Sequence, residues 1–462
     1  MKRIACFCIP AHGHTNPMTA VAAELVTRGN TVRFYSFRAF QDKIESAGAE
    51  FVSLDNYLPE LSEQEEQALK NVKISEMTVQ DIHITIKLTD FLAEEIKNFR
   101  PDIIYCDSAC FWGKLSAWKY NVPLVVSTST FAFNRLSSQY MKHSPAEMAD
   151  MIFGLPKISR EMKKLEALGY PRKGVLELVS SDNKTDSVVY TSKTFQPYAA
   201  SFSDHYLFMG PSLRTHIVPD KEKARPLIYI SMGTVINDRP DFYQHCMDAL
   251  KDADADVIIS CGKSVDIASF GTLPQNIRMY PSVNQLEVLS EADLFITHCG
   301  MNSVSESLYM AAPMLLYPQT GEQHAVARRV HELGAGEYLR DDSAEGIRTA
   351  VSGILKTGTY TEAARRCCDD LRGCCGTQGA AQFIENAPHT SESPDPLKEL
   401  SRMNLPFSLL FRVFAAVLIL TGSILKIKGL WIAGIAACIL AKPFDRLVTQ
   451  MHYKKLEKRL KV

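Results

Sequence analysis

The chain has 462 residues, of which 46% are hydrophobic and 22% are charged, with 24 Gly and 22 Pro. This composition is typical of a folded protein and excludes disordered, collagen-like and low-complexity chains. Lys and Arg total 51 against 52 Asp and Glu, and a net charge of −1 gives no reason to expect nucleic-acid binding. The length predicts more than one domain, because one hydrophobic core stops growing near roughly 250–300 residues.

The N-terminus and the cysteines bear on the compartment. No apolar run of signal-peptide length precedes Pro10, and the 12 cysteines are scattered along the chain. Both features favour a reducing cytoplasm.

The first 130 residues alternate between short apolar runs and amphipathic stretches. A helix is expected over residues 16–28, with Asn16 as its N-cap and Pro17 as its first residue. Strands are expected at 3–9, 31–37, 50–54, 102–106 and 124–127. Strands that alternate with helices predict a parallel sheet covered on both faces.

A second α/β series follows the polar stretch 209–223. Its expected strands are 227–231, 256–260, 277–280, 294–297 and 314–317. We therefore predict an α/β fold with two Rossmann-like, doubly wound domains that face a cleft, comprising residues 1–210 and 224–386.

The last 76 residues differ in composition. Residues 387–404 are rich in Pro, Ser and charge, which indicates a linker. Residues 407–425 contain a single charge, Arg412, and a basic tail ends the chain. We expect residues 405–462 to form a membrane-associated apolar helical hairpin with a transmembrane helix, its tail lying at an anionic leaflet. A pair of core helices, or a hairpin that docks on a partner, is the alternative.

Two polar positions follow strands of the first series. His12 and His14 come after the first strand, and Asp107 ends the fourth. Ligands of open α/β sheets bind at the carboxyl ends of strands. A carboxylate beside His14 would fix the imidazole tautomer and stabilise the imidazolium, so we predict a His14–Asp107 dyad. The alternative for Asp107 is a helix N-cap.

The most specific pattern is a strand, a Gly-bearing turn and a helix start over residues 295–303. Backbone N–H groups and the positive end of the helix then point at one place, which suits a diphosphate. His298, Asn302 and Ser303 are side-chain donors there, and Glu306 could accept from both hydroxyls of a ribose. The alternative is an ordinary turn with Asn302 as a cap.

These motifs resemble those of a known family. The segments PAHGHTNP (10–17), PDIIYCD (101–107), ISMGT (230–234) and the block 282–325 are similar to those of the large UDP-sugar-dependent glycosyltransferase family with the GT-B fold. The likeness covers about residues 1–385 and is nearest in character to the bacterial macrolide-type enzymes. It implies an acceptor-binding first domain and a nucleotide-sugar-binding second domain.

The resemblance also implies residue roles. His14 would be the general base that takes the acceptor proton, Asp107 would orient it, and His12 would be a bystander. The implied donor-binding residues are Gly233, Thr234, Val283, Gln285, His298, Gly300, Asn302, Ser303, Glu306, Glu322 and Gln323. Ser282 and Asn284 stand where the family commonly has a stacking residue and Pro, and Glu322 stands where Asp is usual.

The expected reaction is an inverting transfer of a hexose, glucose, from a UDP-sugar to a hydroxyl of an apolar small molecule or lipid at the cytoplasmic face of a membrane. No cofactor and no metal is expected. Cys367-Cys368 and Cys374-Cys375 could suggest a metal site, but four thiols on one helix do not easily converge tetrahedrally. A sugar-nucleotide epimerase and a non-catalytic sugar-nucleotide-binding partner protein are the alternatives.

Overall fold

The computed structural model describes the chain except for residues 58–72, 214–216, 220–222, 234–236, 391–394, 425–426 and 461–462. The described residues form two compact units. One comprises residues 1–181, 185–197 and 207–388, and the other comprises residues 182–184, 198–206 and 389–462. Each unit is described by itself.

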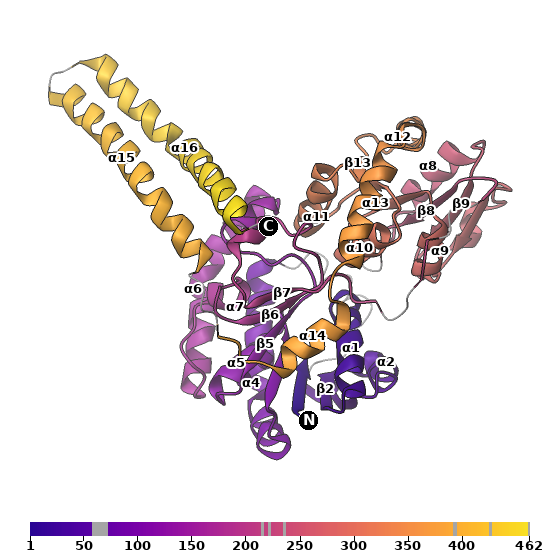
Figure 1. The fold of residues 1–462 in the computed structure, drawn as a ribbon, viewed down its shortest axis with the longest axis horizontal. Helices are drawn as coiled ribbons and strands as arrows, with labels where there is room; N and C mark the ends of the chain where they lie inside the picture. Colours follow the sequence, from indigo (N-terminus) through magenta and orange to yellow (C-terminus); the bar gives the residue numbers. More distant parts are fainter. Residues whose placement is uncertain are drawn as a thin grey trace. The chain divides into compact units, whose positions relative to one another are not determined.

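The first sheet of the larger unit has the strand order β3-β2-β1-β4-β5-β6-β7 (Figure 1). Its strands are β1 (Arg3–Phe7), β2 (Thr31–Ser36), β3 (Glu50–Ser53), β4 (Ile103–Asp107), β5 (Leu124–Thr128), β6 (Asp186–Val189) and β7 (Tyr206–Phe208). The pairs from β3 to β6 are parallel. The helices are α1 (His12–Thr27), α2 (Gln41–Glu45), α4 (Ile74–Phe99), α5 (Phe111–Lys119), α6 (Pro145–Ala167) and α7 (Val175–Val179).

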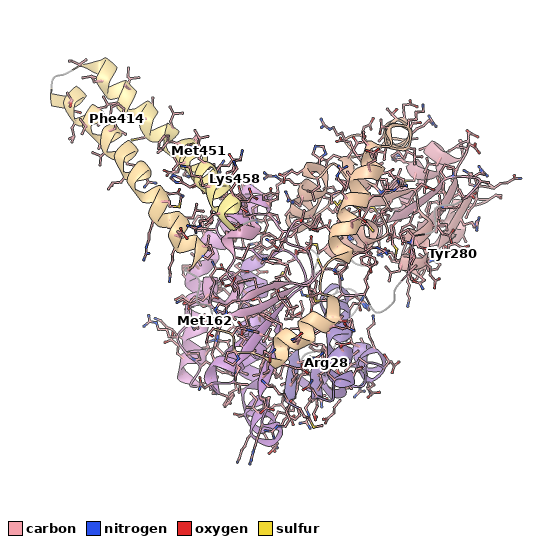
Figure 2. The ribbon with its side chains drawn as sticks, in the orientation of Figure 1. Arg28, Met162, Tyr280, Phe414, Met451 and Lys458 are labelled. Carbon is pink, nitrogen blue, oxygen red and sulfur yellow. The ribbon has the colours of Figure 1, made fainter. Side chains whose placement is uncertain are left out.

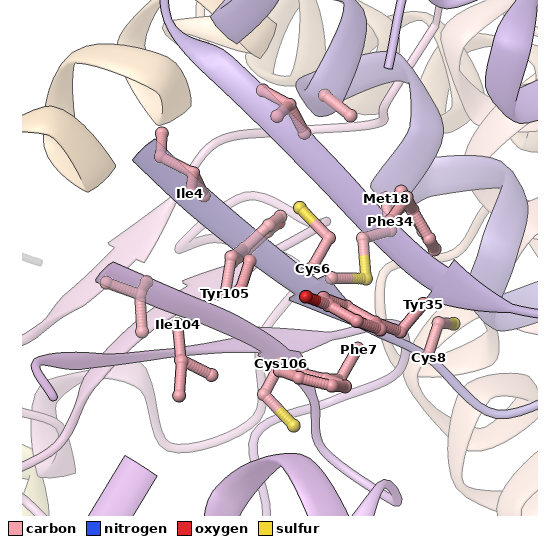
Figure 3. Close-up of a cluster of buried hydrophobic side chains, with 14 of the residues drawn as sticks. Ile4, Cys6, Phe7, Cys8, Met18, Phe34, Tyr35, Ile104, Tyr105 and Cys106 are labelled. Atoms are coloured by element: carbon pink, nitrogen blue, oxygen red, sulfur yellow. The ribbon is translucent and has the colours of Figure 1, made fainter. Parts of the chain in front are cut away.

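The core of this sheet consists of the apolar runs that identify its strands. Phe7 of β1 stacks on Tyr35 of β2 with ring centroids 4.5 Å apart, and Tyr105 and Cys106 of β4 are buried beside them (Figure 3). Strands buried on both faces explain the nearly continuous hydrophobic runs in the sequence. The sequence did not predict β6 or β7.

The second sheet has the order β10-β9-β8-β11-β12-β13, and all its neighbours are parallel. Its strands are β8 (Leu227–Ser231), β9 (Asp256–Ser260), β10 (Ile277–Tyr280), β11 (Leu294–Thr297), β12 (Met314–Leu316) and β13 (Gly336–Tyr338). The helices are α8 (Pro240–Leu250), α9 (Gln285–Glu291), α10 (Met301–Tyr309), α11 (Gly321–Glu332), α12 (Ala344–Thr357) and α13 (Thr359–Arg372). The prediction of two doubly wound parallel sheets is therefore confirmed.

One helix returns to the first sheet after the second is complete. The core of the first sheet includes Ala380, Ala381 and Ile384 of α14 (Gly376–Glu385). Glu385 accepts hydrogen bonds from Arg28 and Asn30, which follow α1. The predicted segment 224–386 thus contains a helix that packs with the other sheet.

The start of α1 differs from the prediction. The helix begins at His12 instead of residue 16, and Pro17 lies inside it. A proline in the second turn has no N–H to donate to the carbonyl four residues earlier. The helix tolerates this because that carbonyl, on Gly13, has a different partner: it accepts a hydrogen bond of 3.1 Å from Asn302 Nδ2.

The smaller unit is built on two helices, α15 (Pro396–Ile424) and α16 (Lys428–Leu460), which pack against each other (Figure 1). Contacts of Asn404 with Thr449 and of Arg412 with Asp445 show that they run antiparallel. Within the same unit, Tyr453 OH of α16 accepts a hydrogen bond from Ala200 N. The predicted linker 387–404 is wrong from Pro396 onward, because Asp395 accepts from Leu397 N and caps a helix that begins with proline.

Two further expectations concern helices. No helix in the described part of the chain is long and apolar enough to cross a membrane, so the expected transmembrane helix is not supported. The sequence analysis treats the four cysteines as lying on one helix, and this is wrong. Helix α13 ends at Arg372, so Cys374 and Cys375 do not share a helix with Cys367 and Cys368.

Close packing of α5 on the first sheet leads to a stability prediction. A Cβ added at Gly113 would lie 2.4 Å from Cys106 Sγ and 2.7 Å from Phe7 Cβ. Gly113→Ala should therefore lower the free energy of unfolding by about 1–3 kcal/mol, measured by denaturant titration. Gly353→Ala in α12 is the matched control, because nothing lies within 4 Å of its added Cβ. An equal loss in both variants would contradict the packing argument.

Candidate active site

The candidate site residues follow the central strands of the two sheets. In the first sheet β1 and β4 are neighbours, and the order turns outward from them to β2 on one side and β5 on the other. In the second sheet β8 and β11 have the same relation. Loops that leave adjacent parallel strands in opposite directions leave room for a ligand at the carboxyl ends of those strands. His14 follows β1, Asp107 ends β4, Gly233 follows β8, and His298 follows β11.

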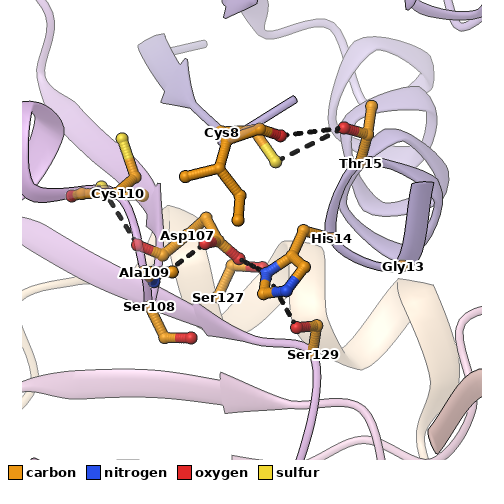
Figure 4. Close-up of polar contacts among 12 residues, drawn as sticks. Cys8, Gly13, His14, Thr15, Asp107, Ser108, Ala109, Cys110, Ser127 and Ser129 are labelled. Atoms are coloured by element: carbon orange, nitrogen blue, oxygen red, sulfur yellow. Dashed lines mark hydrogen bonds and ion pairs between the residues drawn. The ribbon is translucent and has the colours of Figure 1, made fainter. Parts of the chain in front are cut away.

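His14 and Asp107 are in direct contact (Figure 4). His14 Nδ1 lies 2.8 Å from Asp107 Oδ2, and the Asp107 side chain is fully buried. The other carboxylate oxygen, Oδ1, accepts a hydrogen bond of 2.9 Å from Ala109 N. This bond holds the carboxylate in place. The imidazole is 26% exposed, so solvent or a ligand can reach it.

Ser129 is a third member of this group that the sequence analysis missed. Its Oγ lies 3.0 Å from His14 Nδ1, just beyond the end of β5 (Figure 4). An Nδ1–H shared between Asp107 and Ser129 leaves Nε2 as the unprotonated ring nitrogen. The only sequence signal for Ser129 was its place after a central strand.

The environment of His14 changes its basicity. Burial, the largest effect, lowers the pKa of His14, but the charge and hydrogen bond of Asp107 and the charge of Glu322 outweigh it and raise the pKa above its usual 6.5. The pKa of His12 moves the other way, because burial and the charges of Lys43 and Lys263 lower it. The ring of His12 packs edge-on against Phe40, with centroids 5.0 Å apart.

His298 lies between two glycines. A Cβ at Gly233 would lie 2.5 Å from His298 Nε2, and a Cβ at Gly300 would lie 2.6 Å from it. Gly233 also has a φ of +79°, which favours glycine. Burial lowers the pKa of His298 to about 4, so the ring is neutral at pH 7. Its buried Nδ1 has no hydrogen-bond partner in the described part of the chain, which is uncommon for a buried polar atom.

Three of the predicted donor-binding side chains are bonded together. Gln285 Nε2 donates to Glu306 Oε2 at 2.6 Å and to Ser303 Oγ at 3.2 Å. Tyr229 OH of β8, which the sequence analysis missed, donates to Gln285 Oε1 at 3.3 Å. Burial raises the pKa of Glu306, and the hydrogen bond from Gln285 opposes this. The group connects the starts of α9 and α10.

Asn302 links the two sheets. It lies in the first turn of α10, whose N-cap is Gly300, and its amide donates to the Gly13 carbonyl beside His14. The backbone turn before the helix includes Cys299 with a φ of +68°, an uncommon conformation for a residue with a side chain. The start of α10 and the residue next to His14 are thus within one hydrogen bond of each other.

Glu322 and Gln323 lie in the first turn of α11. Gln323 Oε1 accepts from Thr320 N and Gln319 N, while Thr320 Oγ1 accepts from Gln323 N. Gln323 is therefore part of a capping box, which engages the amide oxygen of a residue predicted to bind the donor. Glu322 is close enough to raise the pKa of His14.

Val283 and Thr234 are two further residues that were predicted to bind the donor. Val283 packs against the apolar core of the second sheet. Thr234 lies outside the described residues.

Two parallel α/β sheets with polar groups after their central strands are consistent with the GT-B fold, and solved structures agree. The structure of the glycotransferase of kitacinnamycin matches with a TM-score of 0.70 and 26% identity over 83% of this chain and 98% of that one. The calicheamicin glycosyltransferase CalG4, at 24% identity, has the same fold with a TM-score of 0.68 over 83% of this chain and 97% of its own.

Sequence relatives identify the family. Residues 244–385 match the family described as "Erythromycin biosynthesis protein CIII-like, C-terminal domain". The chain is 34% identical over 368 residues to the NDP-glycosyltransferase YjiC of Bacillus licheniformis, covering 76% of this chain and 89% of that protein. It is 27% identical to the demethyllactenocin mycarosyltransferase of Streptomyces fradiae, covering 83% and 86%. The chain belongs to the bacterial macrolide-type glycosyltransferases, and it is an enzyme.

The contact between His14 and Asp107 predicts a titration. An NMR titration of the His14 imidazole should give a pKa above 6.5, because the Asp107 carboxylate favours the charged ring. In Asp107→Asn the pKa should fall below 6.5, since burial then dominates. Asp102→Asn is the control, because Asp102 is near Arg3 at the opposite end of β4. A pKa unchanged by Asp107→Asn would show that this carboxylate does not control the ring.

Proposed function

We propose that this glycosyltransferase transfers glucose from a UDP-sugar to a hydroxyl of an apolar acceptor with inversion, and that His14 is the general base. The observation that carries the proposal is the 2.8 Å contact of His14 Nδ1 with the buried Asp107. A carboxylate on Nδ1 favours the tautomer with a basic Nε2 and stabilises the imidazolium once the ring has taken a proton.

The proposed step balances as follows. Nε2 of His14 takes the proton of the acceptor hydroxyl while that oxygen forms a bond to the anomeric carbon. The bond from this carbon to the diphosphate oxygen breaks, and its electron pair leaves with the nucleoside diphosphate. Attack opposite the leaving group inverts the anomeric centre. General-base assistance of this kind contributes about 10²- to 10⁴-fold.

The proposed donor site uses the second sheet. The N-terminus of α10, with Gly300, Asn302 and Ser303, offers N–H groups and a positive helix end to the diphosphate. Neutral His298, backed by Gly233, adds a side-chain donor. Glu306 and Gln285 suit the ribose hydroxyls, because the carboxylate of α10 and the amide at the start of α9 are in hydrogen-bond contact. In this scheme fixed dipoles stabilise the charge that a metal would otherwise stabilise. That the enzyme requires no metal therefore remains a prediction.

The proposed sugar contact is Glu322, whose negative charge raises the pKa of His14. Gln323 would have to use its amide nitrogen, because its oxygen is committed to the capping box. Glucose is proposed partly because some relatives, such as YojK of Bacillus subtilis at 27% identity, are named UDP-glucosyltransferases.

An apolar acceptor has support from the first sheet's helices. Lys142 N donates to Gly321 O, beside Glu322, at 3.5 Å, and α6 begins three residues after Lys142. Met148, Met151 and Ile152 on the first two turns of α6 are exposed. Apolar side chains exposed near a proposed sugar site favour an apolar hydroxylated acceptor. Relatives named for demethyllactenocin and for oleandomycin show that related enzymes are named after acceptors that are small molecules.

The alternatives are not favoured, because the relatives described above are all transferases. An epimerase would release an altered nucleotide sugar without an acceptor. A location at the cytoplasmic face of a membrane stays a prediction.

Mass spectrometry of the purified enzyme with UDP-glucose, UDP-galactose and a panel of hydroxylated hydrophobic compounds tests donor, acceptor and reaction type together.

The general base is tested by comparing two neighbouring histidines. His14→Ala should lower turnover by about 10²- to 10⁴-fold, because no other group then takes the acceptor proton. His12→Ala is the matched control and should keep turnover within a few-fold, since its ring packs on Phe40. The measurement is initial rate of glycoside formation at saturating donor. Near wild-type turnover in His14→Ala would disprove the assigned role.

The ribose contact is tested at Glu306. Glu306→Gln keeps the shape of the group but weakens acceptance from the ribose hydroxyls. The KM for the UDP-sugar should rise about 10- to 100-fold with kcat changed much less, because a hydrogen bond to a charged group is worth about 1.5–3 kcal/mol. Glu291→Gln at the exposed end of α9 is the control. A fall in kcat without a change in KM would place Glu306 elsewhere in the mechanism.

A further inference from the structure

The two helices of the smaller unit pack through small residues. Ala415, Gly434 and Ala437 are buried between α15 and α16. A Cβ added at Gly434 would lie 2.4 Å from Ile419 Cγ1 and 3.0 Å from the Ala415 carbonyl oxygen, so the two backbones approach closely. Interfaces of this kind are characteristic of helices in an apolar solvent, where burial of large side chains gives no advantage.

Many large apolar side chains of the hairpin are exposed, although Leu400, Val448 and Leu456 are buried. Those exposed are Leu409, Val413, Phe414, Val417 and Leu420 on α15, and Ile432, Ile435, Leu440, Leu447 and Met451 on α16. Figure 2 marks Phe414 and Met451 among them. A two-helix hairpin in water would place such residues between its helices and small ones outside. Here small residues lie at the closest contact while these ten large apolar side chains are exposed, and so much exposed apolar surface favours a partner.

Charge is distributed unevenly along the same hairpin. From Leu409 to Ala441 the sequence has three charged residues, Arg412, Lys426 and Lys428, and the Arg412 guanidinium is 2.9 Å from Asp445. Pairing lowers the cost of a charge in an apolar medium. At the other end of α16, Lys454, Lys455 and Lys458 are exposed (Figure 2 labels Lys458). The hairpin thus has two uncharged stretches, residues 413–424 and 429–441, and a cationic end at Lys454, Lys455 and Lys458.

We propose that the uncharged stretches 413–424 of α15 and 429–441 of α16 insert into the hydrocarbon of an anionic lipid surface, while Lys454, Lys455 and Lys458 stay at the headgroups. Buried apolar area and attraction of basic residues to anionic lipid are the two terms that hold such segments. A second copy of the chain is the other occupant that could cover the apolar residues, and the test below distinguishes it from lipid. The proposal does not depend on the sugar-transfer reaction.

The test is flotation of the full-length protein with vesicles of phosphatidylcholine, with and without phosphatidylglycerol. The wild type should float with both and more strongly with the anionic vesicles, and added salt should reduce only that difference. Val417→Glu, at a side chain that is 51% exposed, should abolish flotation with both vesicle types. Val218→Glu is the matched control at a 69% exposed valine of the larger unit, and it should float like the wild type.

A second variant tests the charge without touching the apolar surface. The triple change Lys454→Glu, Lys455→Glu and Lys458→Glu should lower partitioning onto anionic vesicles on the order of 100-fold or more and leave binding to phosphatidylcholine unchanged. The same change at exposed Lys87, Lys97 and Lys157 of the larger unit is its control and should have a much smaller effect. Circular dichroism of every variant verifies that the helices remain folded.

Three results would overturn the proposal. The wild type might remain with the unbound fraction for every vesicle composition, or Val417→Glu and Val218→Glu might float equally well. The third is a dimer in lipid-free buffer, seen by analytical ultracentrifugation, that Val417→Glu dissociates while no form of the protein floats. That result would assign the apolar surface to a second copy of the chain.

Discussion

The arrangement of the site depends on one topological constraint that occurs twice. β1 beside β4, and β8 beside β11, are parallel neighbours whose connections leave toward opposite sides of their sheets. The chain cannot close the space above such a pair, so the residues that follow these strands remain accessible. In the register of β1 and β4, Phe7 pairs with Cys106. Asp107 is the next residue on β4, and His14 lies in the first turn of α1, which follows β1. The 2.8 Å contact between them follows from this alignment.

The two halves of the site meet different electrostatic demands. Asp107 is buried and raises the pKa of His14, which suits the proposed role of that ring as a general base. Around His298 no carboxylate compensates for burial, and a pKa of about 4 keeps that ring neutral. One histidine is prepared to become charged and the other to stay neutral, although both follow a central strand. The link from Asn302 to the Gly13 carbonyl, which Pro17 leaves without a helical partner, joins the halves.

Most strands of both sheets, and the pairing of His14 with Asp107, could be predicted from apolar runs and from the polar residues that end them. Helix starts were less predictable. Asn16 and Pro17 form a good local N-terminal signal, but α1 begins at His12 because a residue 289 positions away satisfies the carbonyl that Pro17 leaves free. Likewise, Asp395 and Pro396 begin a helix within a segment whose composition indicated a linker. Local patterns carry no information about distant hydrogen-bond partners.

The sequence by itself determined most of the strands, the parallel arrangement of the sheets and the family, because periodicity and short motifs are local properties of the chain. Only the tertiary structure decided that Ser129 and Tyr229 join the candidate site and that Gln323 is used as a helix cap. It also decided that α14 packs with the first sheet. The sequence shows that the hairpin is apolar. Only the structure shows that its helices approach closely at Gly434 and leave many large side chains exposed. Contacts between residues far apart in the chain depend on how strands and helices are assembled.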